Sequence, residues 1–84
     1  MQEYRIDCVM RDEHGVITYV HFDGKMHWVS HVALALRNQE YRVYTLMNGS
    51  KAIVYPKRSD NGNWFLITSV DGVTEHKLDF LPTC

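Results

Sequence analysis

Tight-turn dipeptides divide this 84-residue chain into short segments, and they constrain its fold more than any other feature of the sequence. Asn48-Gly49 lies between two runs in which apolar and polar residues alternate, "YRVYTLM" and "SKAIVYP". Asn-Gly in that setting is the strongest short-range signal for a β-hairpin. Asp23-Gly24 and Asp71-Gly72 make similar breaks. The sequence therefore predicts a chain of short strands connected mostly by hairpin turns.

The first expected strand is "YRIDCVMR". Tyr4, Ile6, Cys8 and Met10 alternate there with Arg5, Asp7, Val9 and Arg11, which is the period of two expected of a half-buried strand. In this pattern Cys8 falls on the inward face, where a free thiol behaves as a small apolar residue. After the turn "DEHG", the other expected strands are "VITYVHF", "KMHWV", "YRVYTLM", "SKAIVYP", "WFLITSV" and "VTEHKL". The prediction is about six short antiparallel strands, connected mostly by hairpins.

One helix is expected, over residues 31–38, "HVALALRN". Ser30 is a good N-cap, and Asn38 can adopt the left-handed backbone conformation that ends many helices. Val32, Ala33 and Leu36 fall on one helix face. So short a helix is marginal by itself, and it must be held by packing that face on the sheet.

The fold class predicted is α+β, with a mainly antiparallel sheet and the helix between the third and fourth strands. A chain of 84 residues with 45% apolar content has one core, so residues 1–84 are expected to form a single domain. Nine Lys and Arg against ten Asp and Glu give a formal charge of -1. Global electrostatic attraction to DNA or to an anionic membrane is therefore excluded as the main driver of function.

A cytoplasmic location is expected from three observations. The segment "MQEYRIDCVM" lacks the basic and apolar regions of a signal peptide, and two cysteines are too few for a disulfide framework. The longest uncharged stretch, "MHWVSHVALAL", has eleven residues, whereas a spanning helix needs roughly 20. No membrane segment is predicted.

Three stretches carry a resemblance to a known family: "DEHGVI", "VSHVALAL" and "FLITSVDGVTEHKLDFLP". The chain resembles the small bacterial family known as the domain of unknown function numbered 3892, over nearly its whole length. The C-terminal motif of that family is matched at Phe65, Leu66, Thr68, Asp71, Leu78, Leu81 and Pro82. Ile67 and Lys77 depart from it, where the family often has a basic residue and an Asn. The resemblance implies a fold and no activity.

The spacing of the C-terminal motif also has a physical interpretation. Leu66, Leu78 and Leu81 are spaced to return to the core, and Pro82 removes a hydrogen-bond donor. Because patterned apolar positions mostly report packing, we interpret the motif as the element that closes the fold.

No enzymatic activity, cofactor or metal site is predicted. His27 and His31 have i, i+4 spacing, which on one helix would suit a metal pair, but a cap at Ser30 would leave His27 on the preceding strand. His14, His21 and His76 add no ligand motif. The chain contains no signature of a catalytic Ser or Cys, and its acidic residues have the placing of turn formers and caps.

Charge is distributed unevenly along the chain. Residues 37–59 carry five cations and Glu40, so their net charge is +4, and the other residues sum to -5. Basic and aromatic side chains interleaved on an exposed sheet face can pair with phosphates and stack on bases. Alternatively, the aromatic rings cover the core while Lys and Arg reach water. The candidate binding residues are Arg42, Tyr44, Lys51, Tyr55, Lys57, Arg58 and Trp64.

The sequence thus favours a non-enzymatic interaction domain that binds a macromolecular partner, with a protein preferred. Ten aromatic and four Met residues suit a protein interface. An adaptor or a stoichiometric inhibitor encoded by a mobile element would fit such a chain. The alternative is binding of single-stranded RNA or DNA through the hairpin 41–58, and a homodimer through an edge strand is a further possibility.

Overall fold

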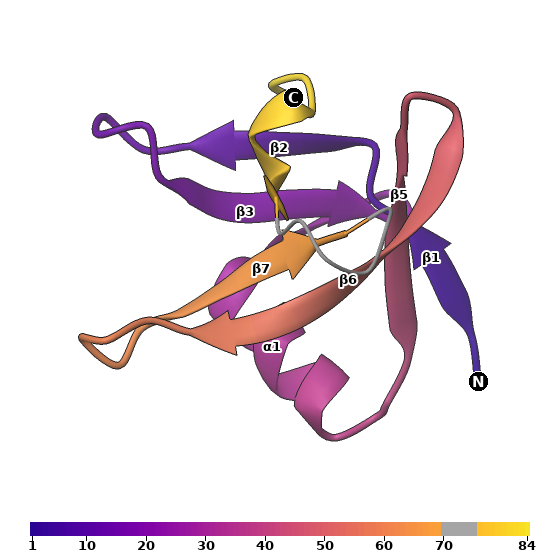
Figure 1. Cartoon of the computed structure of the whole chain (residues 1–84), viewed down its shortest axis with the longest axis horizontal. Coiled ribbons are helices and arrows are strands. Elements are labelled where there is room, and N and C mark those ends of the chain that lie inside the picture. The colour runs from indigo at the N-terminus through magenta and orange to yellow at the C-terminus, as the bar shows by residue number, and fades with distance from the viewer. Residues whose placement is uncertain (70–75) are drawn as a thin grey trace.

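The computed structural model describes residues 1–69 and 76–84, and it has the expected α+β architecture with one α-helix and mainly antiparallel strands (Figure 1). In chain order the elements are β1 (Glu3–Arg5), β2 (Cys8–Arg11), β3 (Ile17–Phe22), β4 (Lys25–Trp28), α1 (Val29–Arg37), β5 (Arg42–Met47), β6 (Ser50–Arg58), β7 (Trp64–Thr68), β8 (His76–Lys77) and the 3-10 turn η1 (Leu78–Phe80).

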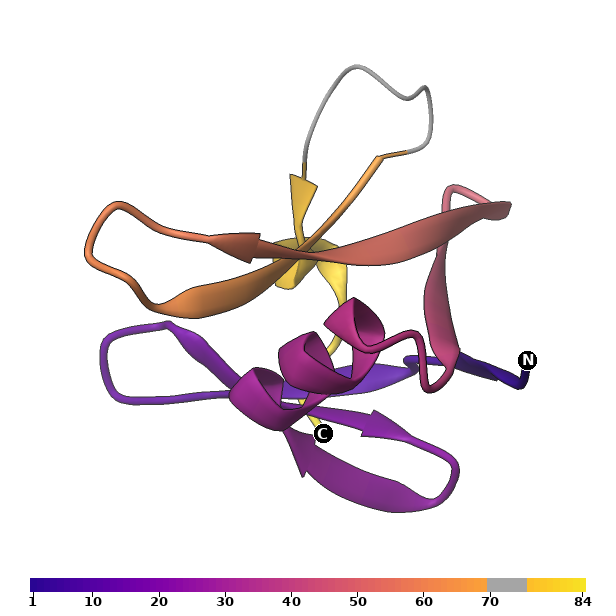
Figure 2. The ribbon, with the colours of Figure 1, turned by 90° about the horizontal axis from the view of Figure 1, so that it is seen from below.

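The strands form two sheets, with the orders β1-β5-β6-β7-β8 and β2-β3-β4. Figure 2 shows the sheets as two layers, and α1 packs against strands of both. The core lies between the layers and under the helix. Its buried members are Ile6, Val9, Val20, Phe22, Val29, Val32, Ala33, Val43, Val54, Leu66, Leu78 and Leu81.

The first predicted strand is divided in two, and its halves belong to different sheets. β1 pairs in parallel with β5, whereas β2 pairs antiparallel with β3. Ile6 and Val9 are both fully buried, so the inward side changes where the chain crosses from one sheet to the other. The expected alternation is therefore wrong beyond Ile6. Cys8 and Met10 point away from the core.

Two of the predicted tight turns have the backbone that their residues favour. Asn48-Gly49 joins β5 to β6 and Asp23-Gly24 joins β3 to β4, with positive φ at all four residues. Positive φ at both central positions defines the hairpin turn that matches strand twist. These hairpins are confirmed. Asp71-Gly72 and residues 73–75 of the last predicted strand lie outside the described residues.

The helix differs from the prediction at both ends. It begins at Val29 with Trp28 as its N-cap, so Ser30 lies inside the first turn. Asn38 has φ -83°, and the left-handed residue is Gln39. The amide of Glu40 donates to Ala35 O, which satisfies a terminal carbonyl. Because the first strand is divided, α1 follows the fourth strand. The predicted apolar face is confirmed, since Val32 and Ala33 are fully buried.

The C-terminal motif closes the core, as its spacing predicts. Leu66, Leu78 and Leu81 are each at most 9% exposed. The segment then runs parallel to β2, where the backbone N–H of Val9 donates to Pro82 O and the backbone C=O of Val9 accepts from the amide of Cys84.

In the described part of the chain, no helix is long and apolar enough to span a membrane.

Candidate functional site

The outer face of the three-stranded sheet carries six side chains in two cross-strand rows. Strand alternation and register place them opposite the buried Val9 and Val20. One row is Cys8, His21 and Met26, and the other is Met10, Tyr19 and Trp28. We call these six side chains the Met/Trp face.

Large apolar groups on the Met/Trp face have much of their surface in solvent. Met10 is 43% exposed, Met26 39% and Trp28 50%. The ring of Tyr19 lies 4.4 Å from that of Trp28, centroid to centroid. Such cross-strand aromatic pairs stabilise a sheet, so the two rings hold one another in place. Large contiguous apolar patches are more often interaction sites than singly scattered apolar residues are.

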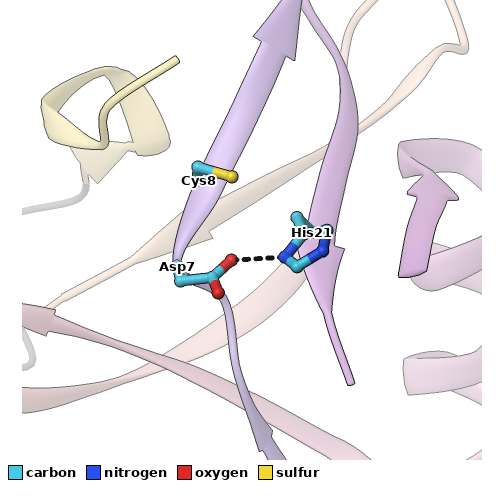
Figure 3. Close-up of side chains that lie close together, drawn as sticks. All are labelled: Asp7, Cys8 and His21. Carbon is cyan, nitrogen blue, oxygen red and sulfur yellow. Dashed lines mark hydrogen bonds and ion pairs between the residues drawn. The ribbon is translucent and has the colours of Figure 1, made fainter. Parts of the chain in front are cut away.

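A hydrogen-bonded pair lies at one end of the Met/Trp face, where Asp7 and His21 point toward one another (Figure 3). Because a carboxylate can only accept, His21 Nδ1 donates to Asp7 Oδ1 over 2.7 Å. This hydrogen bond is the main reason that the pKa of Asp7 lies below its ordinary value of 3.8.

Cys8 and Cys84 form a disulfide beside this hydrogen-bonded pair. The prediction of a free, inward-facing thiol is therefore wrong. Cys8 faces outward because the chain crosses between the sheets just before it. The C-terminal segment lies along β2, which brings the two Cα atoms to 5.1 Å, within the usual range for a disulfide. Sequence spacing alone could not show that residues 76 positions apart meet.

Arg11 also holds the C-terminal segment against β2. Its guanidinium donates to Thr83 Oγ1 at 2.9 Å, to Asp79 O at 2.9 Å and to Leu81 O at 3.3 Å. Hydrogen bonds from a charged donor are stronger than neutral ones. The end of β2 is thus fixed by both a covalent link and a polar clamp.

Five of the seven predicted binding residues share one face of the larger sheet. They occupy every second position along β5 and β6. Because Tyr44 pairs with Ile53, the residues at these positions in the two strands lie on the same side of the sheet. Tyr55 is 49% exposed. We call these five residues the basic face: Arg42, Tyr44, Lys51, Tyr55 and Lys57.

One cation of the basic face is partly neutralised by β1. Lys51 forms an ion pair with Glu3, and its Nζ lies 4.7 Å from the centroid of the Tyr44 ring. Glu3 is far from Lys51 in sequence, but β1 pairs with β5 and places Glu3 opposite Arg42. The charge count along the sequence therefore overstates the positive charge of this face.

Arg58 and Trp64 do not lie on the basic face. They pair with one another across β6 and β7, and in β6 Arg58 follows Lys57, so it points to the opposite side. Trp64 packs against the core cluster, and the guanidinium carbon of Arg37 lies 4.5 Å from its ring centroid. The interpretation that aromatic rings cover the core holds for Trp64.

His27 and His31 do not form a pair. His27 lies on β4, as expected, and stacks on Phe22 with ring centroids 3.8 Å apart. His31 is exposed on α1. Among the described residues, the side chains that bring potential metal ligands together are instead Asp7, Cys8 and His21.

A groove of about 410 Å³ lies between the two sheets. It is lined by the turn between β2 and β3, the turn between β6 and β7, and η1. Its volume is in the range of small-molecule sites. Of the seven predicted binding residues, Trp64 contributes to its wall.

No model of a protein family, no curated protein and no solved structure matches this chain. The resemblance to the domain of unknown function numbered 3892 stays a prediction. The geometry of the two faces is therefore the basis for assigning a function.

Proposed function

We propose that this protein is a non-enzymatic interaction domain and that it binds another protein through the Met/Trp face. The observation that carries this proposal is the row of Met10, Tyr19 and Trp28, aligned across three strands with Met10 and Trp28 substantially exposed. Aromatic residues and Met are enriched in protein interfaces, and charged residues are depleted from their centres.

The chemistry of the face favours an apolar protein segment as its occupant. None of its six residues is Lys or Arg, so it offers no cation for phosphates, which supply most of the affinity in nucleic-acid binding. Its imidazole, His21, is engaged by Asp7 at the rim. A partner that buries aliphatic or aromatic groups against Trp28 would desolvate few charges.

Met26→Glu is expected to abolish capture of the partner in a pull-down from the native host, because it places a charge on the Met/Trp face, two residues along β4 from Trp28. Leu34→Glu is the matched control, since Leu34 is 53% exposed on α1 and off this face. Truncating an interface anchor typically costs at least 2 kcal/mol, or about 30-fold in affinity. The loss is to be verified by titration with the purified partner.

Two outcomes separate this proposal from its competitors. Equal partner affinity for Met26→Glu and Leu34→Glu would rule out the Met/Trp face. A dimer in light scattering that Met26→Glu dissociates would reassign the face to self-association. The free energy of unfolding of both variants should stay within about 0.5 kcal/mol of the wild-type value, the usual range of surface substitutions.

A second candidate function is binding of single-stranded RNA or DNA at the basic face. The observation that favours it is that Arg42, Lys51 and Lys57 share a side of the sheet with two tyrosines. Tyr55 is exposed enough to stack on a base. We rank this function second, because Glu3 pairs with Lys51 and the chain as a whole carries -1.

Arg42→Glu and Arg58→Glu provide a charge-matched test of the second function. Both arginines are exposed, but they lie on opposite sides of the sheet. If the basic face binds oligonucleotides, Arg42→Glu should weaken binding and reduce its salt dependence, whereas Arg58→Glu should have less effect. We expect negligible binding at physiological salt. A submicromolar, salt-sensitive complex that Arg42→Glu abolishes would reverse the ranking.

We also propose a cytoplasmic location, with the protein acting as an adaptor or stoichiometric inhibitor. A disulfide that persists in the cell would indicate an oxidising compartment instead, because disulfides are rare in the cytosol. In a reducing cytosol Cys8 and Cys84 would be present as two thiols.

A further inference from the structure

The disulfide and the Asp7–His21 pair form one cluster at an end of the Met/Trp face. One potential ligand atom from each of Asp7, Cys8 and His21 lies within 4.8 Å of the others. The sulfur of Cys84 is bonded to that of Cys8, so reduction would free a second sulfur beside these three groups. In the disulfide, neither sulfur is a thiolate, and only thiolates ligate metal strongly.

We propose that reduction of the Cys8–Cys84 disulfide creates a zinc site whose four ligands are the two thiolates, the His21 imidazole and the Asp7 carboxylate. This inference does not depend on the proposed partner. The sequence-based expectation of no metal would then apply to the oxidised chain alone.

The donor set is one that zinc selects. Thiolate, imidazole and carboxylate are its usual protein ligands, and four-coordinate tetrahedral geometry is typical of structural sites. Bond lengths of about 2.0–2.3 Å set tetrahedral ligand atoms about 3.3–3.8 Å apart. The ligand atoms of Asp7, Cys8 and His21 have to contract by about 1 Å at their widest, and Asp7 and His21 have to separate by less than that. The two sulfurs, bonded to one another in the disulfide, have to move apart to the tetrahedral separation. Cys84 and Asp7 are exposed, so their side chains can move.

The neighbouring structure holds the ligands in place after reduction. Cys8 and His21 are opposite one another in the β2–β3 ladder. The segment that carries Cys84 keeps its hydrogen bonds to Val9 and the clamp from Arg11, which do not involve sulfur. Release of Cys84 from the disulfide therefore leaves it next to β2.

The redox step is balanced by a dithiol reductant. The dithiol transfers two electrons and two protons to the disulfide and becomes a cyclic disulfide, which leaves two thiols on the protein. Zn²⁺ binding then displaces the two thiol protons. In the reverse step the two thiolates would transfer two electrons to a disulfide oxidant, which takes up two protons and becomes a dithiol, while the protein disulfide re-forms and Zn²⁺ is released.

The test is a titration of the full chain with Co²⁺, after reduction with a water-soluble phosphine under anaerobic conditions. The reduced chain is expected to bind one Co²⁺, with the visible bands of a tetrahedral centre and the charge-transfer band of cobalt thiolate, and Zn²⁺ should displace it. The oxidised chain should show neither signal. His21→Ala is expected to weaken metal affinity at least about 10-fold, and His31→Ala, on exposed α1, should leave it unchanged.

Circular dichroism of the reduced chain covers the case in which reduction unfolds it. In that case Zn²⁺ should restore the native spectrum of the wild type and of His31→Ala, but not of His21→Ala, because metal binding and folding are then coupled. The proposal is overturned if the reduced chain binds no Co²⁺, or if His21→Ala and His31→Ala bind it equally. It is also overturned if Zn²⁺ leaves an unfolded reduced chain unfolded.

Discussion

Leu66→Ala is expected to lower the free energy of unfolding by about 2–5 kcal/mol, the usual cost of truncating a buried leucine. Leu66 is 4% exposed and lies in β7, where it joins the core cluster beneath α1. For a domain of this size, each kcal/mol lowers the melting temperature by about 4–8 °C. Chemical denaturation followed by tryptophan fluorescence measures the change directly.

Leu34→Ala is the control for this prediction, because it makes the same substitution at a residue that is 53% exposed. Its effect should stay within about 0.5 kcal/mol, as for ordinary surface changes. If Leu66→Ala had as small an effect as Leu34→Ala, the C-terminal motif would not be a closing element of the core, and its leucines would need another role.

Removal of the disulfide is the second large effect expected. The Cys8→Ser, Cys84→Ser double variant should be less stable than the oxidised wild type by about 4 kcal/mol, since a link across 76 residues removes much of the entropy of the unfolded chain. The comparison is to be made by urea denaturation with a chelator present, so that metal does not contribute.

Reduced wild type in the same chelator should match the double variant. A difference of less than about 1 kcal/mol between the oxidised and serine chains would show that the hydrogen bonds from Arg11 and Val9 hold the C-terminal segment without help. In that case the link would constrain the unfolded chain much less than its length implies.

The candidate sites were predictable to different degrees. Alternation along residues 42–57 places Arg42, Tyr44, Lys51, Tyr55 and Lys57 on one side of a hairpin, and the structure has them there. The Met/Trp face was missed, although the turn at Asp23-Gly24 fixes its register. Period-two alternation separates two faces of a strand without showing which one is buried. In the second half of the first predicted strand, the buried positions are those that the alternation of the first half would place outward.

The sequence by itself determined the features that depend on neighbouring residues. Asn48-Gly49 and Asp23-Gly24 set their hairpins because these residues accept positive φ. The apolar face of α1 and the burial of the C-terminal leucines also followed from spacing alone. Only the tertiary structure decided how the segments meet: which sheet each half of the first strand joins, how Glu3 reaches Lys51, and how Cys84 reaches Cys8. These contacts join residues up to 76 positions apart, and they form because the two sheets must enclose one core, a condition that no local pattern encodes.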